Sequence, residues 1–111
     1  MRISIRAKGV ENNDALQERV RRRAAFALSR FGDVVQDVDV LLEDVNGPRG
    51  GVDQRCRFLV SLRRGDSPVI CETIHADINA AIDISGDRVG RTVARAMERH
   101  HRSRTGADKP R

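Results

Sequence analysis

Apolar residues in the C-terminal part of the chain recur every three or four positions, which predicts one long helix from Asp77 to Arg102. The predicted buried stripe comprises Ile78, Ile82, Val89, Val93 and Met97, with Ala81, Ser85, Gly86 and Ala96 beside it. This spacing is typical of a helix that buries a single face. Asp77 is a suitable N-cap, because its carboxylate can accept from the free amide groups of the first turn.

A second helical pattern predicts a helix from Asn13 or Asp14 to about Phe31. Gly32 follows it, in the position where a residue of left-handed conformation often ends a helix. The predicted buried stripe is Leu16, Val20, Ala24, Ala27 and Phe31, and the opposite side carries Arg19, Arg22, Arg23, Phe26 and Arg30.

Alternation of apolar and polar residues predicts strands at residues 2–6, 34–45, 53–64 and 67–75. Residues 46–51 and the pair Gly65-Asp66 carry the glycine and proline expected of turns. Consecutive strands with short connections pair as a meander. We therefore expect an α+β fold in the order β-α-β-β-β-α, with one antiparallel four-stranded sheet and two helices on one face, similar to double-stranded-RNA-binding domains. Residues 1–102 form a single domain in this interpretation, and residues 103–111 a disordered basic tail.

The outer face of the predicted sheet is mixed. Asp37, Asp39 and Glu43 on one strand can face Arg55, Arg57 and Arg63 on the next, and opposite charges across a strand pair are stabilising. Leu41, Leu59, Ile70 and Ile74 also point outward in this register. They are either scattered surface residues or an apolar patch that supports a weak homodimer.

Composition narrows the class of function. The chain has 111 residues, of which 33% are charged, and its net charge is +5, which favours an anionic partner. Aromatic residues make up only 3%, so Phe26, Phe31 and Phe58 are the only rings available. This scarcity argues against binding a run of single-stranded nucleic acid by base stacking. The chain carries neither a signal-peptide core nor an apolar run of transmembrane length, so we expect a cytoplasmic protein with no membrane partner.

Arginines recur along both predicted helices at helical spacing. The candidate RNA-binding residues are Arg19, Arg22, Arg23, Arg30, Arg88, Arg91, Arg95, Arg99 and Arg102. Guanidinium groups on one face repel each other unless an anion lies across them, and each can pair with two phosphate oxygens. The alternative is a solvated basic face without a partner. Because both helices lie on the same side of the predicted sheet, we expect their arginines to form one basic surface.

Cys56, Cys71 and His75 are the residues that thiol catalysis or a zinc site would need. If Gly65-Asp66 is a two-residue turn, Cys56 lies opposite His75. Both cysteines nevertheless fall on the core-facing register, where a free cysteine usually acts as a small apolar residue. We therefore expect no enzyme activity, no metal and no cofactor.

Three segments carry a resemblance to a known family: NNDALQERV in the first helix, HADINAAID at the start of the last helix, and DRVGRTVAR after it. From residue 1 to about residue 100 the chain resembles the ribosome hibernation-promoting factor and ribosome-associated inhibitor A family, in its short form. The resemblance implies a stress protein that binds the small ribosomal subunit and its rRNA, blocks the channel for messenger and transfer RNA, and inhibits translation. It carries over to Arg88, Arg91 and Arg95, whereas the arginines of the first helix rest on helical spacing alone.

Two alternatives stay open from the sequence. One is a generic binder of structured RNA, which reads shape and phosphates across a minor groove. The other is a protein-interaction module that modulates transcription.

Overall fold

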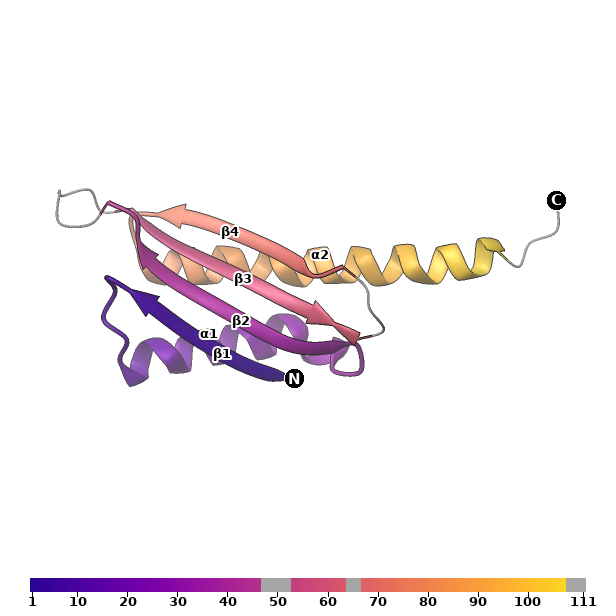
Figure 1. Cartoon of the computed structure of the whole chain (residues 1–111), viewed down its shortest axis with the longest axis horizontal. Coiled ribbons are helices and arrows are strands. Elements are labelled where there is room, and N and C mark those ends of the chain that lie inside the picture. Colours follow the sequence, from indigo (N-terminus) through magenta and orange to yellow (C-terminus); the bar gives the residue numbers. More distant parts are fainter. Residues whose placement is uncertain (47–52, 64–66, 108–111) are drawn as a thin grey trace.

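The computed structural model describes residues 1–46, 53–63 and 67–107, with side chains described as far as Arg99. Its elements are β1 (Arg2–Lys8), α1 (Asp14–Leu28), the 3-10 turn η1 (Ser29–Phe31), β2 (Val35–Asp44), β3 (Gln54–Leu62), β4 (Val69–His75) and α2 (Ile78–Ala107) (Figure 1). This order confirms the predicted α+β arrangement.

The four strands form one sheet in the order β1-β2-β3-β4. β2, β3 and β4 pair antiparallel as the predicted meander. β1 pairs parallel to β2, so the sheet is mixed and the expectation of a wholly antiparallel sheet was wrong. The reason is that α1 lies between β1 and β2 in the chain, and a helical crossover returns the chain to the starting end of the first strand.

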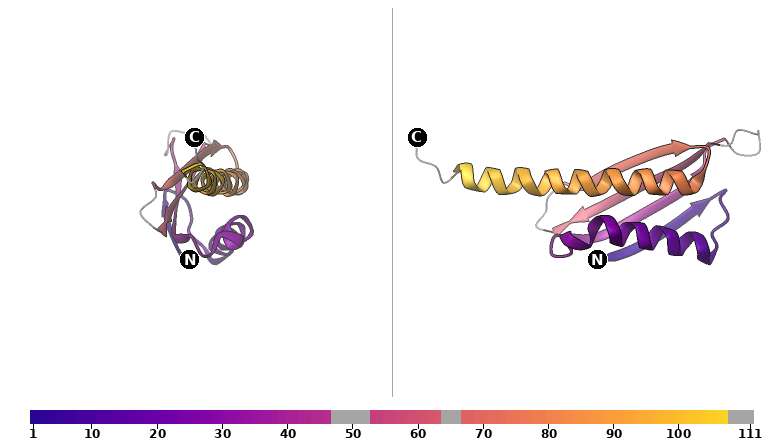
Figure 2. Two further views of the ribbon diagram at one scale, coloured as in Figure 1. Left: turned by 90° about the vertical axis from the view of Figure 1, so that its right-hand side faces the viewer. Right: turned by 180° about the vertical axis from the view of Figure 1, so that it is seen from behind.

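Both helices cover the same face of the sheet and run side by side, with their N-termini at the same end (Figure 2). Between this layer and the sheet lies an aliphatic core that includes Val20 and Leu28 of α1, Val38, Val40, Cys56, Phe58 and Val60 of the sheet, and Ile82, Val89 and Val93 of α2. The predicted stripes are largely correct. In α1, however, Leu28 is fully buried while Ala27 is only half-buried, because Ala27 faces α2 instead of the sheet.

The predicted caps are confirmed at both helix starts. Asn13 Oδ1 accepts the backbone N–H of Leu16 at 2.8 Å, and Asp77 Oδ1 accepts that of Asn79 at 3.0 Å. The predicted left-handed Gly32 was wrong, since its φ is −55°. The chain instead tightens into η1, and the Gly32 N–H donates to the Ser29 carbonyl at 3.1 Å.

α2 continues past its predicted end at Arg102 to Ala107, and its last turns extend beyond the sheet (Figures 1 and 2). The helical backbone therefore covers the first five residues of the predicted tail, and residues 108–111 lie outside the described residues. Ser103 to Thr105 include neither proline nor glycine, so nothing in that stretch interrupts the helix.

The pairing of β3 with β4 differs from the prediction by two residues. Cys56 lies opposite Thr73, and His75 lies opposite Gln54. The turn predicted at Gly65-Asp66 and most of the turn predicted at residues 46–51 lie outside the described residues.

The outer face is less apolar than predicted. Ile70 and Ile74 are 60% and 53% exposed and Leu59 is half-buried, but Leu41 is only 6% exposed. Arg6 and Arg57 are its neighbours across the strands, and long arginine side chains can cover an apolar neighbour. Opposite charges also meet on this face as expected, for Arg55 Nη1 lies 2.9 Å from Glu43 Oε1.

Within the described part of the chain, no helix is long and apolar enough to span a membrane.

Candidate nucleic-acid interface

Two glycines of α2 allow the helices to approach closely. A Cβ at Gly90 would lie 3.1 Å from both the Cβ and the carbonyl oxygen of Ala27 on α1. A Cβ at Gly86 would lie 2.6 Å from Cγ of Arg23. The missing side chains thus fix which flank of α2 faces α1, and Arg23 packs over Gly86.

The arginines of α1 and η1 gather along the groove between the helices. Arg19 Nη2 lies 2.7 Å from Asp83 Oδ2 on α2, and the Arg23 guanidinium lies 5.3 Å from the centre of the Phe26 ring. Arg30 lies over the Phe31 ring at 4.7 Å. Arg22 Nη2 lies 3.0 Å from Oε1 of Glu18, which is one turn earlier in α1. We call Arg19, Arg22, Arg23 and Arg30 the interhelical strip.

The α2 arginines lie on the other flank of that helix, toward the edge strand β4. Arg88 Nη1 donates to the Glu72 carbonyl oxygen of β4 at 3.3 Å. Arg88, Arg91 and Arg95 line a depression with Cys71 of β4 and Thr92. Arg95 and Arg99 are exposed and make no ion pair with any described residue. We call Arg88, Arg91, Arg95 and Arg99 the edge strip; the side chain of Arg102 lies outside the described residues.

The eight candidates whose side chains the structure describes therefore do not share one groove, because α2 itself separates the two strips. Arg91 connects them, since it lines both the depression beside β4 and a depression that it shares with Arg23, Arg30 and Asp87. Arg91 Nη2 lies 3.1 Å from Asp87 Oδ2, one turn before it. The ion pairs in both strips are exposed, and such pairs are worth about 0–1 kcal/mol. A phosphate can replace these carboxylates at little cost in stability.

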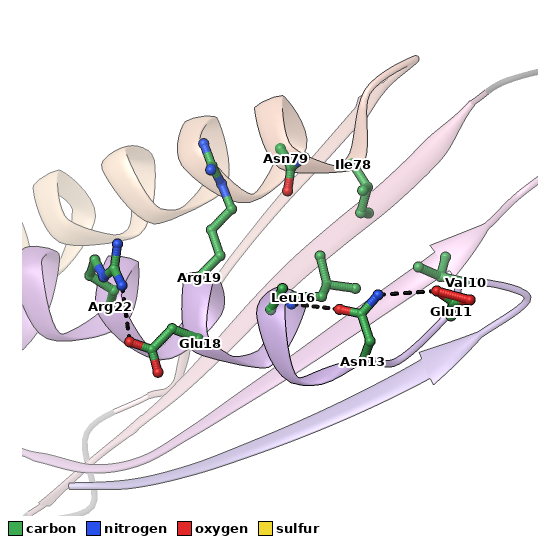
Figure 3. Close-up of a pocket in the computed structure, with 10 residues that line it drawn as sticks. Val10, Glu11, Asn13, Leu16, Glu18, Arg19, Arg22, Ile78 and Asn79 are labelled. Atoms are coloured by element: carbon green, nitrogen blue, oxygen red, sulfur yellow. Dashed lines mark hydrogen bonds and ion pairs between the residues drawn. The ribbon is translucent and has the colours of Figure 1, made fainter.

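A third depression lies where α1 and α2 begin, with a volume of 660 Å³ (Figure 3). Its apolar lining comprises Val10, Ala15, Leu16 and Ile78. Arg19 extends from α1 toward α2 at its rim. Glu11 and Glu18 line it together with Arg19 and Arg22, so its formal charges cancel. This balance makes it a poorer place for a polyanion than the two arginine strips.

The cysteines do not form the constellation that thiol chemistry needs. Cys56 is fully buried, and burial raises the pKa of its thiol from 9.0 to about 12, so the thiol stays protonated. Cys71 Sγ lies 3.7 Å from Thr92 Oγ1, and His75 Nδ1 accepts the backbone N–H of Asp77 at 3.0 Å. Across residues 1–46, 53–63 and 67–99, no three His, Cys, Asp or Glu side chains are grouped to hold a metal ion.

Sequence reasoning placed one feature of this surface and missed another. Helical spacing put Phe26 on the arginine side of the first helix, and the ring is 79% exposed there, beside the interhelical strip. The sequence pattern placed only Gly86 beside the buried stripe, and Gly90 was given no role. Their spacing of four residues, which repeats on one helix face, was the signal that a second helix packs there.

Comparison with known proteins shows which family the chain matches. The model of the sigma 54 modulation protein / S30EA ribosomal protein family matches residues 3–101. No curated protein matches the chain.

Two solved structures share the fold. The N-terminal domain of Protein Y from Thermus thermophilus is 29% identical, with a TM-score of 0.70 over 86% of this chain and 98% of that one. A ribosomal subunit interface protein from Coxiella burnetii is 14% identical and has a TM-score of 0.72 over 88% and 99%. At 14% identity, the likeness to the Coxiella burnetii protein shows a shared fold and nothing more. Since the family match spans almost the whole described sheet and both helices, this chain belongs to the sigma 54 modulation protein / S30EA ribosomal protein family.

Proposed function

We propose that this protein is a ribosome hibernation factor of the cytoplasm. In this proposal it binds the small ribosomal subunit, occupies the channel for messenger and transfer RNA, and inhibits translation under stress. The observation that carries the proposal is the pair of arginine strips on the helix layer of a chain that belongs to a family described as ribosomal. Its role is binding rather than catalysis.

Phosphate recognition explains why arginine is used here. Its planar guanidinium can bond two phosphate oxygens at once, and it keeps its charge at every physiological pH. The strips lie on two flanks of α2, so a folded RNA or two RNA segments can be contacted along the helix layer. Phosphate contacts position a protein on RNA without reading its sequence, which suits the binding of one fixed particle rather than a sequence motif.

Sedimentation tests the proposal. Tagged protein in lysates from growing and starved cells should move with ribosomes in a sucrose gradient, more so after starvation. In a gradient that separates the subunits, the protein should follow the small one. Protein that stays at the top of the low-salt gradient would contradict ribosome binding, and movement with the large subunit would contradict the proposed location.

The family description also favours a second candidate, a modulator of a transcription factor. Ribonuclease treatment separates the two: a complex held by RNA phosphates is lost when the RNA is digested, whereas a complex with a transcription factor survives. Generic binding to structured RNA predicts instead equal affinity for ribosomal and unrelated folded RNA.

A weak homodimer through the outer sheet face is a separate proposal. Its patch is limited to Ile70 and Ile74, with Leu59 half-buried beside Ile70. Sedimentation equilibrium should show a concentration-dependent mass that Ile70→Ser reduces. A mass that stays monomeric at millimolar protein would contradict it.

A further inference from the structure

Phe26 is the one large aromatic side chain of the described residues that folding leaves in solvent. It is 79% exposed, whereas Phe58 is fully buried and Phe31 packs against the core. Phe26 lies in the last turn of α1, on the flank that faces α2. An apolar ring of this size gains nothing from such a position in the free protein, because burial of an aromatic side chain is strongly favourable.

The surroundings of the ring are cationic. On one side, Phe26 lines a depression of 290 Å³ with Arg19, Arg22, Arg23 and Asp83. On the other side, it lines a depression of 260 Å³ with Arg23, Arg30, Arg91 and Asp87. Five arginines therefore surround one ring, and two aspartates only partly balance their charge.

The arrangement of Arg23 and Phe26 is built by both helices. Arg23 is half-buried and lies against Gly86, where a Cβ would come within 2.6 Å of Cγ. From there its guanidinium reaches 5.3 Å from the ring centre, within the range of a cation–π contact. The high exposure of Phe26 shows that Arg23 leaves most of the ring surface accessible.

We propose that Phe26 is a stacking platform for one unpaired base of RNA, with the surrounding arginines on the phosphates of the same and adjacent nucleotides. This inference rests on the proposed function and adds the kind of RNA feature that is bound. A paired base is enclosed by its own stack and offers no face, whereas a bulged base does. Base–aromatic stacking tolerates any base, because every base has a π-face. The surplus of positive charge favours RNA over an apolar segment of a protein.

A fluorescent substitution tests the stack directly. The chain contains no Trp and no Tyr, so Phe26→Trp would give a single tryptophan signal from this site. An RNA hairpin with one bulged nucleotide should quench that signal as it binds, and so should purified small subunits. A fully paired hairpin and a hairpin with an abasic bulge should bind without comparable quenching. Binding of the bulged hairpin and of small subunits without quenching would overturn the proposal.

Affinity measurements provide an independent test. Phe26→Leu keeps an apolar side chain but removes the ring, and it should weaken binding of the bulged hairpin by roughly tenfold while leaving the paired hairpin unchanged. Phe26→Tyr keeps an aromatic ring and should therefore bind the bulged hairpin with the wild-type affinity. Ile70→Leu is the matched control, because Ile70 is an exposed apolar residue on the opposite face, and it should change neither affinity.

The outcomes separate this inference from the proposed function. If Phe26→Leu binds both hairpins and ribosomes as the wild type does, the platform is refuted and ribosome binding stands. If Phe26→Leu loses ribosome binding but keeps its affinity for the bulged hairpin, the ring contacts a protein instead, which also refutes the platform. If the wild-type protein does not sediment with ribosomes, the proposed function fails whatever the hairpins show.

Discussion

Cys56 lies on β3 with no exposed surface, and burial raises the pKa of its thiol to about 12. Between pH 9 and 12, the unfolded chain loses this proton while the folded chain keeps it. The folded state therefore binds more protons, and its stability falls with rising pH by about 1.4 kcal/mol per unit. This loss should appear above pH 9 in urea unfolding, and Cys56→Ala should show a smaller slope even if it is less stable at pH 7. Equal slopes for the two proteins would contradict a buried, protonated thiol.

Val93 is fully buried where α2 packs on the sheet. Val93→Ala should lower the free energy of unfolding by about 2 kcal/mol, because it removes buried methyl groups and leaves a small cavity. Arg95→Ala, two residues further along the same helix and exposed, should change it by less than about 1 kcal/mol. Chemical denaturation of both variants measures the difference; similar values would mean that the burial assigned to α2 is wrong.

At the scale of elements, the close approach of α1 and α2 depends on Gly86 and Arg23 together. Gly86→Ala should gain about 1 kcal/mol of helix propensity but must displace Arg23, whose Cγ lies 2.6 Å from the new Cβ. In an Arg23→Ala background the displacement is absent and only the gain is left. A double-mutant cycle should therefore give a coupling of about 1 kcal/mol or more. A coupling near zero would contradict direct packing of Arg23 on Gly86.

The helices and strands could be predicted from the sequence because their apolar residues recur with different periods. Residue type also indicated both N-caps, with Asn13 and Asp14 as alternatives for the first helix, whereas the C-terminal cap expected at Gly32 was wrong. The register in which β4 pairs with β3 could not be predicted. A shift of two residues keeps every side chain on its own face, so alternation alone does not distinguish Thr73 from His75 as the neighbour of Cys56. Nor did the pattern indicate that β1 is parallel to β2.

The candidate site was predictable only in part. Helical spacing correctly placed Arg88, Arg91, Arg95 and Arg99 away from the stripe formed by Ile82, Val89 and Val93. It did not reveal which flank of α2 faces α1, because that depends on the contact of Gly90 with Ala27. For the same reason it could not show that, among the described residues, Arg91 connects the two strips, or that Phe26, which it did place beside the arginines of the first helix, also faces Asp87 and Arg91 of α2.

At the scale of the whole molecule, the net charge of +5 and the two arginine strips predict strongly salt-dependent binding. If the protein contacts about six phosphates, the logarithm of its affinity for ribosomes should fall with the logarithm of salt concentration at a slope of roughly −4 to −5. The slope is obtained from binding measured at several potassium chloride concentrations between roughly 50 and 300 mM. A nearly flat dependence would indicate a protein contact instead.

The edge strip offers the most direct test of the central claim that these helices bind RNA through their arginines. The decisive measurement is inhibition of translation in a cell-free extract by the triple variant Arg88→Ala, Arg91→Ala, Arg95→Ala. Its matched control is Arg2→Ala, Arg6→Ala, Lys8→Ala, which removes the same charge from exposed positions on β1, on the opposite face of the sheet. Both should melt near the wild-type temperature, because exposed charges contribute little to stability.

The account predicts that the edge-strip variant needs at least roughly a hundredfold higher concentration for half-inhibition, as expected when several phosphate contacts are lost together. The β1 variant should inhibit within a few fold of the wild-type concentration. Inhibition by the edge-strip variant at the wild-type concentration, or an equal loss in both variants, would contradict the account.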